Sequence, residues 1–115
     1  MTKVEQQNAF IKDFARLILM ADSFGLTVTA GELMRSQEQQ NIYLESGRTT
    51  IAHSIHQDRM AGDLNFFKDG VLTYAKADIQ KLGDYWESLN EHNKWGGNWT
   101  TFVDTPHFER HFVPE

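Results

Sequence analysis

Two long amphipathic helical patterns, separated by short strand-like stretches, most constrain how this chain can fold. The first pattern covers Val4–Asp22, where apolar residues recur every three or four positions. Gly25 follows it and suits a left-handed helix cap. The second pattern covers Ala75–Asn90 and has the same spacing, although Gly83 inside it weakens the prediction.

The stretches between these patterns carry strand and hairpin signals. Leu26–Ala30 alternates and is rich in β-branched residues, and this strand could continue to Leu33. Met60–Phe67 also alternates, Lys68-Asp69-Gly70 has turn chemistry, and Val71–Tyr74 is a candidate return strand. Helices interspersed with hairpins predict an α+β fold in which a small antiparallel sheet packs with helices.

Four further segments complete the expected organisation. Ser36–Glu45 begins like a capping box and predicts a shorter helix, and a loop is expected over Arg48–Ile55. Trp95–Trp99 is a glycine-rich loop with an aromatic residue at each end. Phe102–Val113 is a last extended segment, which a proline interrupts.

Composition limits the classes of function. The 115 residues are enough for one domain, residues 1–115, and we expect a monomer. A net charge of -5, with scattered Lys and Arg, argues against a nucleic-acid partner. The absence of cysteine excludes thiolate ligands and disulfides. The N-terminus lacks a signal-peptide core, and the most apolar run, Phe14–Met20, is too short for a membrane span. We therefore expect a soluble protein made in the cytoplasm.

Two short stretches each offer an imidazole and a carboxylate. His56 and Asp63 lie in the first, and Asp104 and His107 in the second. Two His and one Asp can hold zinc with an open fourth position, and the remaining Asp can act as acid and base. Taken alone, each pair has an ordinary explanation, since His56 suits a surface position and Asp104-Thr-Pro suits a turn.

The order of these residues resembles a known family. Ser54-x-His56-(x)4-Ala61-x-Asp63, followed by Asp104-x-x-His107, resembles the zinc D-Ala-D-Ala peptidase family, which includes phage L-alanyl-D-glutamate endopeptidases. Further matches, in family order, cover most of the chain from about Gly31 to Phe108. They are Gly31-Glu-Leu-Met-Arg35-Ser36, Gly47-Arg48-Thr49 and Trp95-Gly-Gly-Asn-Trp99.

The resemblance implies the hedgehog/D-Ala-D-Ala-peptidase fold and a role for each matching residue. One zinc ion would be held by His56, Asp63 and His107. Asp104 would be the general base and acid, and Arg35 would bind substrate or stabilise the oxyanion.

Three residues have two interpretations each. Ser54 could support the site or cap its own loop. Arg59 stands where the family usually has glycine; it could point into the cleft as a second cation for an acidic substrate, although a solvated position at the strand end is the simpler expectation. Trp99, or Trp95, could wall the substrate cleft, with core packing or loop anchoring as the alternative.

The remaining histidines receive weaker assignments. His53 is close to His56 but does not fit the motif, and His92 suits a helix end. Glu109 and His111 would share a face with His107 on a regular strand. They could orient a metal ligand, but we expect both side chains to be exposed.

The function implied by the resemblance is a zinc metallopeptidase that hydrolyses the stem peptides of peptidoglycan. Asp rather than Glu before His107 resembles the phage branch, which favours an L-alanyl-D-glutamate endopeptidase. The alternatives are a D-Ala-D-Ala carboxypeptidase and a non-enzymatic zinc-binding module of the same fold. Without a signal peptide, the enzyme would reach the cell wall through a phage holin or through host lysis.

Overall fold

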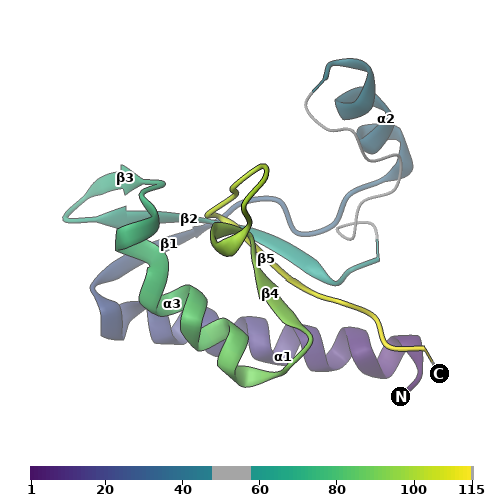
Figure 1. Cartoon of the computed structure of the whole chain (residues 1–115), viewed down its shortest axis with the longest axis horizontal. Coiled ribbons are helices and arrows are strands. Elements are labelled where there is room, and N and C mark those ends of the chain that lie inside the picture. Colours follow the sequence, from purple (N-terminus) through teal and green to yellow (C-terminus); the bar gives the residue numbers. More distant parts are fainter. Residues whose placement is uncertain (48–57, 115) are drawn as a thin grey trace.

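The computed structural model describes residues 1–47 and 58–114 and has the α+β architecture that the sequence predicts (Figure 1). Its described helices are α1 Lys3–Ala21, α2 Gln37–Glu45 and α3 Lys76–Leu89, with short 3-10 turns η1 Asp22–Phe24 and η2 Gly96–Asn98. Its described strands are β1 Leu26–Ala30, β2 Ala61–Lys68, β3 Val71–Thr73, β4 Asn93–Trp95 and β5 His107–Arg110. They form an antiparallel sheet in the order β1-β2-β5-β4, and β3 also pairs with β2.

Helix α1 follows its sequence pattern to within one residue at each end. Thr2 and Glu5 form a reciprocal capping box at its start, and Gly25, at φ 72°, takes the left-handed conformation after η1. Helix α2 likewise begins at the Ser36 cap, whose hydroxyl accepts a hydrogen bond from the Gln39 N–H. None of the helices in the described residues combines the length and hydropathy that crossing a bilayer requires.

Helices α1 and α3 lie on the same side of the sheet (Figure 1). Aromatic and aliphatic side chains form the core. Trp86 of α3 is fully buried and meets the rings of Phe10 and Phe108 edge to face, with centroids 5.6 and 6.0 Å away. Gly83 allows this packing, because a Cβ there would lie 2.2 Å from Cε3 of Trp95. The glycine that weakens the helical pattern is therefore a contact point for a buried tryptophan.

Two features of the sheet are local consequences of the sequence. Asp69 and Gly70 have φ of 52° and 78°, and this pair of left-handed residues makes the tight turn between β2 and β3. Strand β1 ends at Ala30 rather than continuing as a strand. Backbone hydrogen bonds nevertheless join Gly31 N to Asp63 O (2.9 Å) and Asp63 N to Glu32 O (2.7 Å).

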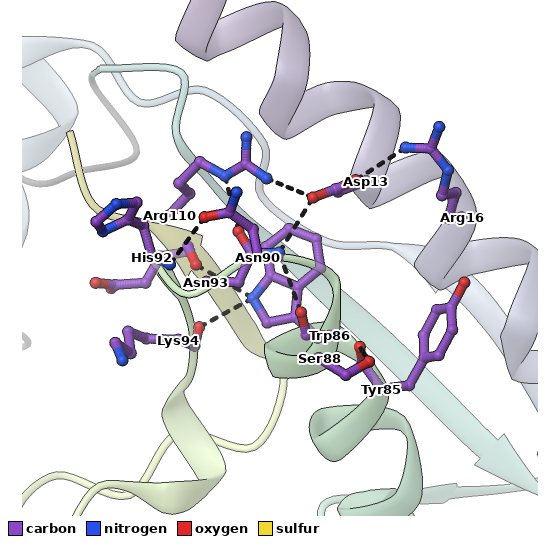
Figure 2. Close-up of polar contacts among 11 residues, drawn as sticks. Asp13, Arg16, Tyr85, Trp86, Ser88, Asn90, His92, Asn93, Lys94 and Arg110 are labelled. Atoms are coloured by element: carbon purple, nitrogen blue, oxygen red, sulfur yellow. Dashed lines mark hydrogen bonds and ion pairs between the residues drawn. The ribbon is translucent and has the colours of Figure 1, made fainter. Parts of the chain in front are cut away.

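A buried polar network attaches β5 to the helices (Figure 2). Arg110 of β5 pairs with Asp13 of α1 and donates from Nε to Asn93 Oδ1 (2.8 Å). Asn93 in turn donates to Asp13 Oδ2 (3.3 Å) and to the Trp86 carbonyl (3.0 Å). The Trp86 indole N–H donates to the Glu109 carbonyl (3.1 Å). Side chains on α1 and α3 therefore fix where β5 lies.

Candidate metal centre

Strands β2 and β5 bring Asp63 and His107 face to face. The two residues are direct partners in the antiparallel register, so their side chains lie on the same face of the sheet. His107 Nδ1 lies 3.0 Å from Asp63 Oδ1. Zinc bonds of about 2.0–2.2 Å place tetrahedral ligand atoms roughly 3.3 Å apart, so this spacing fits a shared metal ion.

Asp104 reaches the same place through a turn. The His107 N–H donates to the Asp104 carbonyl (3.2 Å), and the Asp104 N–H donates to the Gly96 carbonyl (3.0 Å). Ligand atoms of Asp63, Asp104 and His107 all lie within 4.8 Å of one another. The turn interpretation of Asp104 and its interpretation as an acid/base residue are therefore compatible, because the turn places the Asp104 carboxylate next to Asp63 and His107.

Hydrogen bonds to Thr105 hold the turn that carries Asp104 in place. The Trp95 indole N–H donates to the Thr105 carbonyl (2.8 Å), and the Thr105 hydroxyl donates to the Tyr74 carbonyl (2.8 Å). Gly96 is needed for the close approach, since a Cβ there would lie 2.3 Å from the Asp104 carbonyl oxygen. The Trp95–Trp99 segment, expected to be a loop, therefore ends β4, forms η2 and supports Asp104.

The other ring nitrogen of His107 has its own carboxylate. Nε2 lies 2.6 Å from Glu109 Oε1, and Glu109 Oε2 lies 2.5 Å from His111 Nε2. The expectation that Glu109 is exposed is wrong, because only 7% of the residue is accessible, whereas His111 is exposed as expected. The sequence signal was the alternation of residues 107, 109 and 111 on one strand face. The burial comes from the neighbouring strands, which that alternation does not reveal.

The ionisable groups respond strongly to this arrangement. Burial alone would lower the pKa of His107, but hydrogen bonds and charge from Asp63 and Glu109 outweigh it and raise the pKa to about 9. Burial would raise the pKa of Glu109, yet its hydrogen bond with His107 and its contact with His111 leave that pKa below the usual range. At neutral pH, below this pKa, the His107 ring of the metal-free protein carries a proton on each nitrogen, and a metal ion bound at Nδ1 would displace one of them.

Arg35 lies in a cluster built by the segment after β1 and by α2. Its Nε donates to Glu32 Oε1 (2.5 Å), its Nη1 donates to Gln40 Oε1 (2.7 Å), and its guanidinium lies 4.8 Å from the Tyr43 ring centroid. The Glu32 carbonyl accepts a hydrogen bond from the Asp63 N–H, which connects this cluster to strand β2. The catalytic role of Arg35 remains a prediction.

The remaining candidates differ in placement. The Trp99 ring lies beside His107, with centroids 5.1 Å apart, whereas Trp95 is fully buried. Arg59 is exposed and has φ 59°, the left-handed backbone that glycine adopts without cost. His56 and Ser54 lie outside the described residues, as does His53. The assignment of His56, Asp63 and His107 as metal ligands remains a prediction. The cluster of one His and two Asp has the ligand types that suit zinc.

Comparisons with known proteins agree with this architecture. The structure of the Serratia marcescens L-Ala D-Glu endopeptidase ChiX superposes with a TM-score of 0.72 at 23% identity, over 96% of this chain and 86% of that chain. The L-alanyl-D-glutamate peptidase of Listeria phage A118 is 30% identical over 97 residues, which are 82% of this chain and 34% of the phage protein. This chain therefore spans about a third of that relative's length.

A family model described as D-alanyl-D-alanine carboxypeptidase matches residues 47–110, which is more than half of the chain. The match begins before the predicted ligand His56 and contains Asp63, Asp104 and His107, the three residues that the fold gathers. It also contains Glu109, the carboxylate partner of His107. The chain therefore belongs to the D-alanyl-D-alanine carboxypeptidase family.

Proposed function

We propose that this chain is a zinc-dependent peptidase that hydrolyses stem peptides of peptidoglycan. Of the candidate bonds, we propose that it cleaves the one between L-alanine and D-glutamate. The observation that carries the proposal is the convergence of Asp63, Asp104 and His107 from two distant segments onto one face of the sheet. Family membership supports a peptidase, and both named relatives are described as acting between L-Ala and D-Glu.

The proposed division of roles follows the family resemblance, and the grouping of Asp63, Asp104 and His107 is compatible with it. His56, Asp63 and His107 hold the metal, with His107 binding through Nδ1 because its Nε2 already contacts Glu109. A zinc ion held there supplies Lewis-acid polarisation of the scissile carbonyl and lowers the pKa of water. Asp104, on the adjoining turn, takes a proton from the attacking water and passes it to the leaving amine.

Substrate binding is assigned to groups around this centre. Arg35 stabilises the developing oxyanion or binds the substrate, and the Glu32 carboxylate fixes its guanidinium. Trp99 walls the cleft beside His107. Ser54 supports the segment that carries His56. Arg59, which is exposed and precedes strand β2, provides a second cation for an acidic substrate.

A D-Ala-D-Ala carboxypeptidase is the second candidate, because the matching family model carries that description. The phage relative favours the endopeptidase and suggests where it acts. We propose that the protein degrades the bacterial wall as a monomer during host lysis, after release through a holin or through lysis itself.

Digestion of purified peptidoglycan, followed by mass spectrometry of the released muropeptides, tests these proposals. New L-Ala carboxyl and D-Glu amino termini identify the endopeptidase, whereas loss of a terminal D-Ala identifies the carboxypeptidase. Asp104→Asn should keep one bound zinc and lose turnover, while Asp22→Asn, at an exposed aspartate beyond α1, should match wild type. Wild-type protein that binds zinc yet releases neither product would leave only the non-enzymatic module.

The metal ligands are tested separately by zinc stoichiometry. His56→Ala and His107→Ala should each abolish stoichiometric binding, whereas His53→Ala should retain it. Full zinc content in either of the first two variants would contradict the proposed ligand set.

A further inference from the structure

Glu109 lies between two imidazoles on the strand that carries His107. One carboxylate oxygen faces His107 Nε2 at 2.6 Å, and the other faces His111 Nε2 at 2.5 Å. An ionised carboxylate can only accept hydrogen bonds, so each of these ring nitrogens must carry the proton. A carboxylate this deeply buried is retained only where it is paired.

This bonding pattern determines which His107 nitrogen remains for a metal. With Nε2 protonated toward Glu109, the lone pair of the neutral ring lies on Nδ1, the atom 3.0 Å from Asp63 Oδ1. Rotation of the ring is opposed on one face by the Trp99 ring, whose centroid lies 5.1 Å away. His107 therefore directs Nδ1 toward the candidate metal centre while Nε2, on the other side of the ring, is hydrogen-bonded to the Glu109 carboxylate.

We propose that Glu109 is a positioning residue that fixes the tautomer and orientation of His107, so that Nδ1 faces the metal. The inference rests on the proposed function, because it assumes that His107 is a metal ligand. In this role Glu109 needs no contact of its own with the substrate or the metal. It acts through His107, and His111 holds its second oxygen.

Two neighbouring features place Glu109 for this role. The Glu109 carbonyl accepts a hydrogen bond from the Trp86 indole N–H (3.1 Å), which ties its backbone to the aromatic core. Glu109 is also the register partner of Ala61, two residues from Asp63 on β2, and the small Ala61 side chain is itself buried. The backbone of Glu109 is thus fixed by the core and by strand pairing, and its carboxylate is held by His107 and His111.

Substitution of Glu109 tests the proposal by zinc affinity, measured by competition with a chromophoric chelator. Loss of such a partner weakens metal binding by about 10–100-fold. We expect Glu109→Gln, which keeps an acceptor oxygen without the charge, near the lower figure and Glu109→Ala near the upper. Glu91→Gln removes an exposed carboxylate that pairs with His92 (3.3 Å) and should leave zinc affinity unchanged.

A spectroscopic measurement separates positioning from general loss of structure. In zinc-loaded wild type, long-range ¹H–¹⁵N correlation spectra should show the His107 Nε2 proton and a metal-bound Nδ1. Glu109→Gln should weaken or broaden the Nε2 proton signal, while the remaining backbone spectrum stays close to wild type. Should Glu109→Ala fail to fold, Glu109→Gln decides the question alone.

The outcomes distinguish this inference from the proposed function. Zinc affinity of Glu109→Gln within threefold of wild type, with an unchanged Nε2 proton signal, would overturn the positioning role and leave the peptidase proposal intact. Wild-type protein that binds no zinc would overturn both. Neither measurement requires turnover of peptidoglycan.

Discussion

The carboxylate of Asp13 allows a direct comparison of a buried and an exposed ion pair. It pairs with Arg110, whose side chain is 8% exposed, and with Arg16 (2.8 Å), whose side chain is 56% exposed. Arg110→Met and Arg16→Met each remove one positively charged partner of the Asp13 carboxylate while keeping a side chain of similar length. The two substitutions differ in burial and in the hydrogen bond from Arg110 Nε to Asn93 Oδ1, which only Arg110→Met removes (Figure 2).

The expected magnitudes differ severalfold. Breaking a buried pair leaves an uncompensated charge and costs about 3–5 kcal/mol, whereas an exposed pair contributes about 0–1 kcal/mol. After Arg110→Met, Asp13 still accepts hydrogen bonds from Arg16 and Asn93. We therefore expect a loss near the lower limit, about 3 kcal/mol, against less than about 1 kcal/mol for Arg16→Met.

Urea denaturation of the metal-free protein, with chelator present, measures both free energies of unfolding. The double variant Asp13→Leu with Arg110→Met should recover most of the loss, since apolar replacement of a whole buried pair is often neutral. Equal losses for Arg110→Met and Arg16→Met would refute the reasoning. So would a double variant that is less stable than Arg110→Met alone.

Three further changes have outcomes that the structure predicts. Gly83→Ala should destabilise the protein by about 1–3 kcal/mol despite better helix propensity, because the new methyl group overlaps the Trp95 ring; an unchanged thermal midpoint would contradict this. Arg59→Gly should stabilise it by about 0.5–1 kcal/mol in urea denaturation, since relief of the left-handed strain exceeds the added chain entropy. The hydrogen bond from Thr73 lowers the pKa of Asp78, so stability from that carboxylate is present above its unfolded pKa and disappears as pH falls through the folded value. Asp78→Asn should therefore be less stable than wild type at neutral pH, and the difference should vanish in acid.

Local patterns in the sequence were enough to predict most of the helices and hairpins. The apolar spacing over Val4–Asp22 gave α1, Lys3–Ala21, and the turn at Asp69 and Gly70 gave the β2–β3 hairpin. Each of these elements is specified by residues within a few positions of one another. Periodicity, caps and turn residues are therefore sufficient signals for them.

Features that depend on distant segments were not predicted. Strand β4, Asn93–Trp95, is too short to show alternation and exists because it pairs with β5. The burial of Glu109 has the same origin, since β2 and β4 flank its strand. Asp104 could be assigned through family resemblance, but its approach to Asp63 depends on the support of the Trp95 indole beneath the turn.

Arg59 shows how the two kinds of information combine. It stands where the family usually has glycine, and its φ of 59° lies in the left-handed region that glycine adopts without cost. The left-handed residue immediately precedes Met60, which is buried, and β2, which carries Asp63. The strain of about 1–2 kcal/mol thus falls on the entry to the strand, and Asp63 itself keeps its pairing with His107.

The geometry of the metal centre depends on strand register more than on loops. A slip of one residue between β2 and β5 would turn His107 away from Asp63, because successive side chains on a strand point to opposite faces. Residues on the opposite face of β5 oppose such a slip: Phe108 packs against Trp86 in the aromatic core, and Arg110 pairs with the buried Asp13. One short strand therefore carries a structural face at 108 and 110 and a chemical face at 107 and 109. If the candidate metal centre binds zinc as proposed, substitutions of Phe108 or Arg110 should alter zinc affinity although neither side chain lies on the face of His107.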